Sequence, residues 1–253
     1  MYVEQVDGSS LVMPTRGDAL YYGNGIVSRK PLYELSERLL KSDIIVLDVG
    51  DCVRDNPEKS LTYSSVPKRD RWKGRPWAKD TLKQMGVVAW DVFRGRIWSL
   101  EEIEDFAVDY AENNIVPYLT NGEVEELLNE MPLIYPGVSG VVQELKKNSD
   151  VVIISRGLKE TTKHTAEELG IDEWYPRVVD KDELAVSLLM ERSARSVAFF
   201  GDTWHELEAG ENAKVYGFDV VNVQVLKELV LDRRADAGIP QSWKGLERIL
   251  TFH

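Results

Sequence analysis

The chain has 253 residues, of which 43% are apolar and 29% charged, and its formal net charge is -12. This length and composition predict one α/β domain with an inserted module, large enough to bury a full hydrophobic core. The acidic balance argues against a general nucleic-acid-binding surface, which depends on Lys and Arg. The single cysteine, Cys52, excludes an intrachain disulfide framework and favours a reducing compartment.

The first residues lack the basic flank and apolar centre of a signal peptide, and no apolar run approaches the length of a membrane-spanning helix. We therefore expect a cytoplasmic protein that binds neither a membrane nor nucleic acid. Residues 1–30 carry many Gly, Pro and Ser turn signals, which predict an N-terminal extension made of turns and a short hairpin. An apolar stripe at helical spacing follows and predicts a helix that contains Leu32, Leu35, Leu39 and Leu40.

Three apolar segments further along the chain are typical of buried strands that end in polar side chains. They cover 44–47, 151–154 and 197–200, and Asp48, Ser155 and Asp202 stand at or just after their ends. Because parallel strands bring their carboxyl ends to one edge of a sheet, we expect these three side chains to lie close together. Open α/β folds bind their ligands at that edge.

Strands and helices alternate through the second half of the chain. Besides the strands above, we predict helices that end near Lys147, Leu169, Met190 and Ala213, strands at 177–179 and 218–223, and a closing helix. This alternation is typical of a doubly wound, Rossmann-like parallel sheet with helices on both faces. Residues 31–53 and 134–253 form this predicted core.

Residues 54–133 separate the first two of these strands by far more chain than one crossover needs. Apolar positions at helical spacing predict helices in this insert, the last of them at 123–130. The insert also holds a run of five cations and two tryptophans: Lys68, Arg69, Arg71, Trp72, Lys73, Arg75 and Trp77. Such a run either receives an anionic substrate, with Arg69 and Arg71 as candidates, or forms a solvated loop.

The order of carboxylate, hydroxyl and carboxylate at these strand ends resembles the haloacid dehalogenase superfamily. A helical insert after the first strand, called a cap, is typical of its phosphoserine-phosphatase-like branch. The resemblance implies that residues 54–133 form such a cap. It also implies a Mg²⁺-dependent phosphomonoester hydrolase that acts on a small phosphorylated metabolite through an aspartyl-phosphate intermediate.

The first motif of that family is Asp-x-Asp-Gly-Thr, whose first aspartate attacks phosphorus and whose second exchanges protons with the leaving group and water. Here Asp48 has the place of the nucleophile, and Gly50 replaces the second aspartate. Asp51 is the nearby candidate for the missing acid. Neighbours on an extended segment point to opposite sides, so we expect Asp51 to aim away from the leaving group. The alternative for Asp48 is an ordinary turn acid after a strand.

The resemblance further implies a Mg²⁺ site made of oxygen ligands. Asp48, the backbone carbonyl of Gly50 and Asp202 would bind the ion directly. Glu206 lies four residues after Asp202, on the same helical face, and would act through a water molecule.

The phosphoryl group would be bound at the second strand end. Ser155 provides a hydroxyl for its oxygens, and Arg156 and Gly157 provide backbone N–H groups. The alternative is that Ser155 only caps the helix that begins near Leu158.

Members of the family also place a lysine before the last motif, where it pairs with the nucleophile and the phosphate. Lys181 is our choice for that role, and Arg177 is the alternative. A solvated lysine at the start of a helix is the other interpretation of Lys181.

The missing second aspartate leaves two other functions open. Members without it include phosphonate-cleaving and dehalogenating enzymes, whose leaving groups need no such proton. The retained Asp202 and Glu206 argue against dehalogenation, because that reaction needs no Mg²⁺. The other candidate, which Gly50 favours, is a catalytically weak or inactive protein that binds a phosphorylated ligand or a partner.

Overall fold

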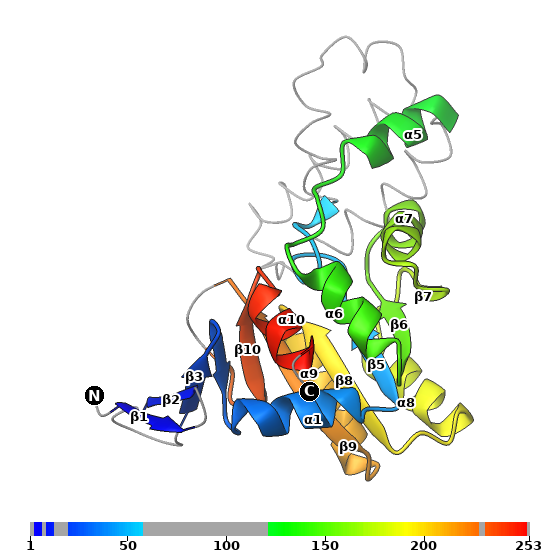
Figure 1. The fold of residues 1–253 in the computed structure, drawn as a ribbon. Coiled ribbons are helices and arrows are strands. Elements are labelled where there is room, and N and C mark those ends of the chain that lie inside the picture. The colour runs from blue at the N-terminus through cyan, green and yellow to red at the C-terminus, as the bar shows by residue number, and fades with distance from the viewer. Residues whose placement is uncertain (1–2, 7–8, 13–19, 58–120, 228–230, 252–253) are drawn as a thin grey trace, which may run out of the picture.

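The computed structural model describes residues 3–6, 9–12, 20–57, 121–227 and 231–251 (Figure 1). Within these ranges, one sheet of ten strands has the order β1-β2-β3-β4-β10-β9-β8-β5-β6-β7. From β10 to β7 in this order, neighbouring strands are parallel. Their bounds are β5 Ile44–Leu47, β6 Asp150–Ile154, β7 Glu173–Tyr175, β8 Ser196–Gly201, β9 Asp219–Leu226 and β10 Ala237–Pro240. The predicted parallel α/β core is therefore confirmed.

The N-terminal strands extend this sheet on the β10 side. They are β1 Val3–Val6, β2 Ser9–Val12, β3 Leu20–Gly23 and β4 Ile26–Ser28, and successive strands pair antiparallel. β4 also pairs antiparallel with β10, with Val27 opposite Gly238 and Ser28 opposite Ala237. The short hairpin predicted for residues 1–30 is thus part of a longer meander, whose attachment to the core sheet was not predicted.

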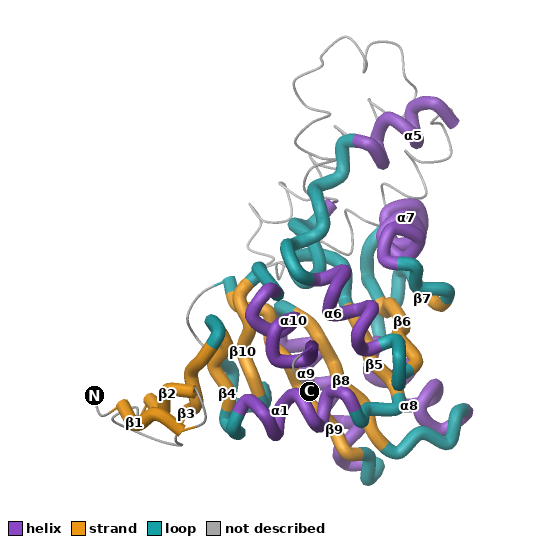
Figure 2. The backbone as a smooth tube through the Cα atoms, in the orientation of Figure 1, coloured by secondary structure: helices purple, strands orange, loops and turns teal. Residues whose placement is uncertain are grey.

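Helices cover both faces of the parallel part of the sheet (Figures 1 and 2). One face carries α1 Leu32–Leu40, α6 Val138–Leu145, α7 Lys159–Leu169 and α10 Lys244–Thr251, and the other carries α8 Lys181–Glu191 and α9 Trp204–Val215. In β5, Ile45 and Leu47 lie in the core on the α1 side. Ile44 and Val46 lie in the core on the α8 side. All four side chains of this strand are buried. Burial on both faces explains why its sequence is a continuous apolar run.

The segment from α7 to β7 contains one accurate prediction and one error. α7 ends at Leu169, as predicted, and Gly170 follows in the left-handed conformation with φ 66°. The strand predicted at 177–179 is wrong, because β7 lies at Glu173–Tyr175. Arg177 has φ 59°, a left-handed conformation that strand residues do not adopt. β10 was also missed, since its sequence Ala-Gly-Ile-Pro contains two residue types that are depleted in strands.

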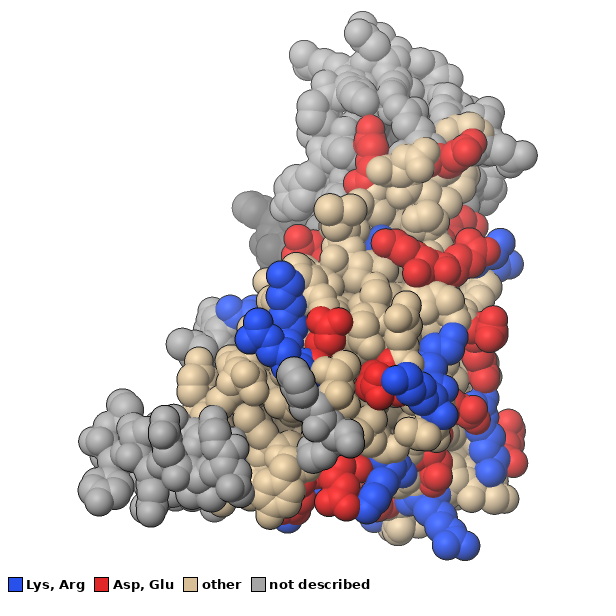
Figure 3. All heavy atoms as spheres, in the orientation of Figure 1, with Lys and Arg blue, Asp and Glu red and all other residues tan. Residues whose placement is uncertain are grey.

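Residues 58–120 lie outside the described residues, and with them most of the predicted cap, including Arg69 and Arg71. The last helix predicted for the insert, at 123–130, corresponds to α5 Asn121–Asn129. Among the described residues, no helix combines the length and the apolar character that a bilayer crossing requires. Acidic and basic side chains are interspersed on the face shown in Figure 3, so the described part of this face is mixed in charge.

Candidate active site

The strand order of the sheet reverses at β5, which lies between β6 and β8. From β5 the chain first adds β6 and β7 on one side, and later β8, β9 and β10 on the other. Open α/β sheets bind their ligands at such a switch point, because the loops after the two central strands diverge there. Asp48 follows β5 and Asp202 follows β8, so both carboxylates stand at the switch point.

The side chain of Asp48 is buried, and a lysine binds it. Lys181 Nζ lies 2.8 Å from Oδ1 of Asp48 and 2.5 Å from Oε1 of Glu206. Lys181 is only 7% exposed, so the interpretation of this residue as a solvated helix-start lysine is wrong. Among the described residues, no hydrogen bond involves Oδ2 of Asp48.

Glu206 connects this lysine to the start of α9. Its Oε2 accepts hydrogen bonds from the backbone N–H and the hydroxyl of Thr203, at 3.2 and 2.6 Å. The contact with the Thr203 N–H is one half of a capping box, and in the other half the Thr203 side chain accepts a hydrogen bond from the helix backbone, so that free backbone N–H groups at the helix start are satisfied. The side chain of Glu206 packs over Gly201. A Cβ atom at position 201 would lie 2.2 Å from Cγ of Glu206. A larger residue at position 201 would therefore displace Glu206 and release Lys181.

A second lysine, absent from the predicted set, bridges two further carboxylates. Lys227 follows β9, and its Nζ lies 2.7 Å from Oδ2 of Asp202 and 2.8 Å from Oδ2 of Asp51. Its place directly after a parallel strand is the signal that points to it, because the strand ends converge at this edge of the sheet.

The expected orientation of Asp51 rested on an extended backbone, and that premise is wrong. Asp51 has φ 56° and lies in a turn, so the alternation of side chains along a strand does not apply to it. Its Oδ1 accepts a hydrogen bond from the backbone N–H of Asn56 at 3.0 Å, while Oδ2 binds Lys227. We refer to the following six residues as the charged cluster: Asp48, Asp51, Lys181, Asp202, Glu206 and Lys227.

Ser155 lies at the end of β6 and is 2% exposed. Its Oγ accepts a hydrogen bond from the backbone N–H of Gly157 at 3.1 Å, which draws the chain into a tight turn. The N-cap of α7 is Leu158, and no side chain caps this helix, so the alternative that Ser155 is its cap is wrong. The hydroxyl and the turn that follows it thus stand beside the strand end of Asp48, since β5 and β6 are neighbours.

A depression of about 330 Å³ adjoins Lys181 between α8 and α9. Arg156, Trp204 and His205 contribute to its wall. Arg156 Nη1 lies 3.3 Å from Nε2 of His205, and the ring centres of Trp204 and His205 are 3.7 Å apart. This depression offers a cation and an exposed aromatic face next to the charged cluster.

Burial weakens the acidity of both strand-end carboxyl groups. Burial and two neighbouring carboxylates raise the pKa of Asp48 to about 7, although Lys181 acts in the opposite direction. Burial also raises the pKa of Asp202 to about 6, despite its hydrogen bond with Lys227. For Lys181, burial favours the neutral amine, but the nearby carboxylates outweigh this and hold its pKa above the ordinary value. The lysine therefore stays charged at neutral pH.

A family model described as haloacid dehalogenase-like hydrolase matches residues 62–214, which is more than half of the chain. The chain belongs to this hydrolase family. The matched stretch includes Ser155, Lys181, Asp202 and Glu206, and it begins after Asp48. No curated protein sequence matches the chain.

Solved structures of low sequence identity share the fold of this haloacid dehalogenase-like hydrolase. DsGPDH of Dunaliella salina is 16% identical with a TM-score of 0.55, and the match covers 86% of this chain but 37% of that one. A substrate-bound phosphoserine phosphatase is 14% identical with a TM-score of 0.53, and the match covers 84% of this chain and 98% of that one. A probable phosphoserine phosphatase from Vibrio cholerae is 14% identical with a TM-score of 0.54, and the match covers 92% of this chain and 68% of that one.

The charged cluster fits the divalent cation that the family resemblance implies. When all six residues are ionised, its four carboxylates exceed its two ammonium groups by two negative charges. One divalent cation would balance this excess, and carboxylate and carbonyl oxygens are the ligands that Mg²⁺ prefers. Within the described part of the chain, no three His, Cys, Asp or Glu side chains are grouped so as to hold a metal ion. The ligand set that the family resemblance implies contains two carboxylates, Asp48 and Asp202, and the backbone carbonyl of Gly50.

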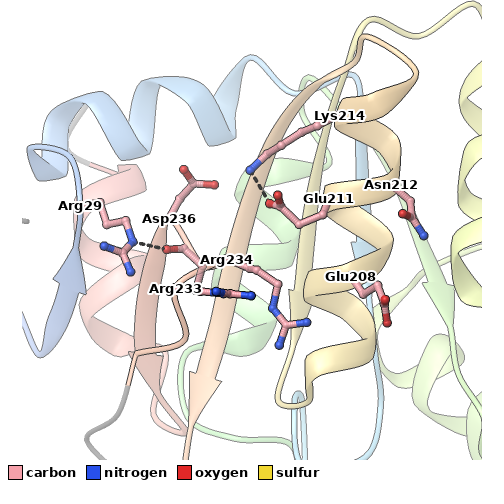
Figure 4. Close-up of a pocket in the computed structure, with 9 residues that line it drawn as sticks. Arg29, Glu208, Glu211, Asn212, Lys214, Arg233, Arg234 and Asp236 are labelled. Carbon is pink, nitrogen blue, oxygen red and sulfur yellow. Dashed lines mark hydrogen bonds and ion pairs between the residues drawn. The ribbon is translucent and has the colours of Figure 1, made fainter.

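A larger cavity, of about 620 Å³, lies between α9 and the segment before β10 (Figure 4). No member of the charged cluster lines it. Its wall carries charges of both signs that are engaged in structural contacts. Lys214 pairs with Glu211 at 2.7 Å, and Arg29 Nε donates to the carbonyl of Ala235 at 2.9 Å. We assign this cavity no part in the chemistry.

Proposed function

We propose that the protein is a Mg²⁺-dependent phosphomonoester hydrolase that cleaves a small phosphorylated metabolite through an aspartyl-phosphate intermediate. The observation that carries this proposal is the position of Asp48, a buried carboxylate at the switch point with one oxygen bound to Lys181. Membership of the haloacid dehalogenase-like hydrolase family supports the same chemistry. Two of the structures with a similar fold are named as phosphoserine phosphatases, which favours a phosphate ester as the substrate.

In this proposal Asp48 is the nucleophile. Its Oδ2 attacks phosphorus, the bond from phosphorus to the ester oxygen breaks, and the phosphoryl group is transferred to the carboxylate. The leaving oxygen takes up a proton from solvent, and water then hydrolyses the aspartyl phosphate to release inorganic phosphate. Lys181, which Glu206 holds in place, orients Asp48 and balances charge on the phosphoryl oxygens together with the hydroxyl of Ser155.

Mg²⁺ would be held by Asp48, the carbonyl of Gly50 and Asp202, with Glu206 acting through a water molecule. When bound, the ion supplies the positive charge that allows an anionic nucleophile to approach an anionic phosphate. Burial and, to a lesser degree, the neighbouring carboxylates raise the pKa of Asp48, and a bound cation would favour its ionised form.

We also propose that residues 54–133 form a cap over a core made of residues 31–53 and 134–253. In this arrangement Arg69 and Arg71 raise the affinity for an anionic substrate. Neutralising both arginines should then raise KM and leave kcat nearly unchanged, which is the pattern of lost uniform binding.

A screen of phosphate esters with Mg²⁺ and with EDTA tests the proposed activity. We expect turnover of some esters with Mg²⁺, no turnover with EDTA, and no turnover by Asp48→Asn, whose amide cannot attack phosphorus. Asp150→Asn is a matched control, because that carboxylate is exposed and pairs with Arg192 away from the charged cluster. Equal turnover by Asp48→Asn and wild type would mean that the nucleophile lies elsewhere.

A further inference from the structure

Lys227 belongs to the charged cluster, but the proposed reaction gives it no role. Its ammonium lies between Oδ2 of Asp202 and Oδ2 of Asp51, at 2.7 and 2.8 Å. The side chain of Asp202 is 4% exposed, whereas that of Lys227 is 46% exposed. A buried carboxylate is therefore neutralised by a cation that reaches in from the surface.

Asp202 is also a proposed Mg²⁺ ligand, so the ammonium and a divalent cation compete for the same carboxylate. Two cations that share one carboxylate lie within about 4 Å of each other, a distance at which like charges repel strongly in a partly buried site. Because the stem of Lys227 is half exposed, its ammonium has access to solvent. Asp51 keeps a negative charge beside the ammonium after it has left Asp202.

We propose that Lys227 is an internal cation that occupies the Asp202 side of the metal site in the metal-free protein and leaves Asp202 when Mg²⁺ binds. This inference rests on the metal site of the proposed function. Lys227 lowers the affinity for Mg²⁺, because its ammonium and the ion repel each other at the carboxylate of Asp202. It also stabilises the metal-free protein, because Asp202 would otherwise be a buried carboxylate without a counterion.

Calorimetric titration of wild type, Lys227→Met and Lys214→Met with Mg²⁺ tests this competition. Methionine keeps the apolar stem of lysine and removes the charge. Lys214 is a matched control, because it is 39% exposed, forms an ion pair with Glu211 and lies near the opposite end of α9 from Asp202. We expect Lys227→Met to bind Mg²⁺ about fivefold more tightly than wild type. Lys214→Met should bind it as wild type does.

Two further measurements separate competition from a purely structural role of Lys227. Lys227→Arg keeps a cation at this position and should bind Mg²⁺ with nearly the wild-type affinity. In EDTA, Lys227→Met should unfold at a lower temperature than wild type, and Mg²⁺ should raise its midpoint by more than it raises that of wild type. A structural role alone would lower the midpoint in EDTA without tightening the binding of Mg²⁺.

Equal or weaker Mg²⁺ affinity in Lys227→Met would overturn the inference and leave the proposed metal site in place. Absence of Mg²⁺ binding in wild type and in every variant would overturn both. If Lys227→Met does not fold without metal, Lys227→Gln is titrated in its place. Glutamine keeps a hydrogen-bond donor without the charge, and the same criterion of tighter binding applies.

Discussion

Lys181 Nζ lies 2.8 Å from Oδ1 of Asp48, although the two residues are 133 positions apart in the sequence. The contact exists because the end of β5 and the start of α8 meet at one edge of the sheet, where Glu206 takes a second hydrogen bond from the ammonium. An ammonium between two buried carboxylates offsets much of the cost of removing them from water. Lys181 thereby allows the carboxylate of Asp48, the proposed nucleophile, to be buried.

Lys181 contacts only Oδ1 of Asp48, so we predict that Oδ2 can bind a covalent mimic of the phosphoryl group. Wild-type protein with Mg²⁺ should form a beryllofluoride adduct on Asp48, detectable by fluorine NMR as bound signals. Asp48→Asn should form none, because an amide oxygen does not displace fluoride from beryllium as a carboxylate does. The variant should keep the wild-type circular dichroism spectrum, since Asn is nearly isosteric. Bound fluoride signals of equal strength in both proteins would place the nucleophile at another residue.

Asp202 is expected to be indispensable for metal binding, because it supplies one of the two carboxylates at the switch point. Asp202→Ala should abolish the heat of Mg²⁺ binding in calorimetry. Asp232→Ala is a suitable control, since that carboxylate is partly buried and pairs with Arg234 outside the charged cluster. Unchanged Mg²⁺ affinity in Asp202→Ala would show that the metal site is wrongly assigned.

The raised pKa of Asp202, about 6 against an ordinary value of 3.8, predicts how stability depends on pH in EDTA. Between these values the folded protein binds more protons than the unfolded chain, so the free energy of unfolding falls as pH rises. From pH 5 to pH 8, the part of this loss that comes from Asp202 should be about 1.4 kcal/mol, or on the order of 4 °C in Tm.

Asp202→Asn tests the share of Asp202 in that trend, because it removes this titrating group while Asp48, whose pKa is also raised, remains. Its Tm in EDTA should change less between pH 5 and pH 8 than that of wild type. Excess Mg²⁺ should remove the trend in wild type, since the cation favours the ionised carboxylates. A wild-type Tm that rises with pH in EDTA would contradict the direction of the shift.

The missing acid at position 50 predicts slow turnover of alkyl phosphates, whose leaving groups need a proton. A positioned proton donor contributes on the order of 10² to 10⁴ in rate. Gly50 has no left-handed φ, and a Cβ there would lie 3.4 Å from the side-chain nitrogen of Asn56, an ordinary contact. Gly50→Asp is therefore compatible with the backbone and should raise alkyl turnover relative to aryl turnover.

Asp51→Asn tests whether Asp51 serves as the missing acid and is compared with Gly50→Asp. Asparagine tolerates the φ of 56° at this position, so the turn should persist. Both oxygens of Asp51 already accept hydrogen bonds, from Asn56 and Lys227, so we expect only a modest change in the ratio of aryl to alkyl turnover. A collapse of alkyl turnover by about a hundredfold in this variant would identify Asp51 as the acid.

The parallel core could be predicted from sequence, because a strand buried on both faces must be apolar along its whole length. β5 meets this condition with four buried side chains, and its polar successor Asp48 marks the carboxyl edge. Ser155 and Asp202 follow from the same pattern in β6 and β8. Lys181 followed from the family resemblance, and the structure places it against Asp48. The catalytic and metal-binding roles of these residues stay predictions.

Tertiary structure alone decided how Lys227 and Asp51 join the charged cluster. Lys227 reaches Asp202 because β9 lies beside β8, in a register that sets Gln224 opposite Gly201. Asp51 joins them because its backbone turns with φ 56°. The sequence does not predict this conformation for an aspartate that follows a strand. The composition of one segment determines which faces it buries and where it stops. Contacts between side chains from different strands depend on the order and register of those strands, and these arise only when the whole sheet is assembled.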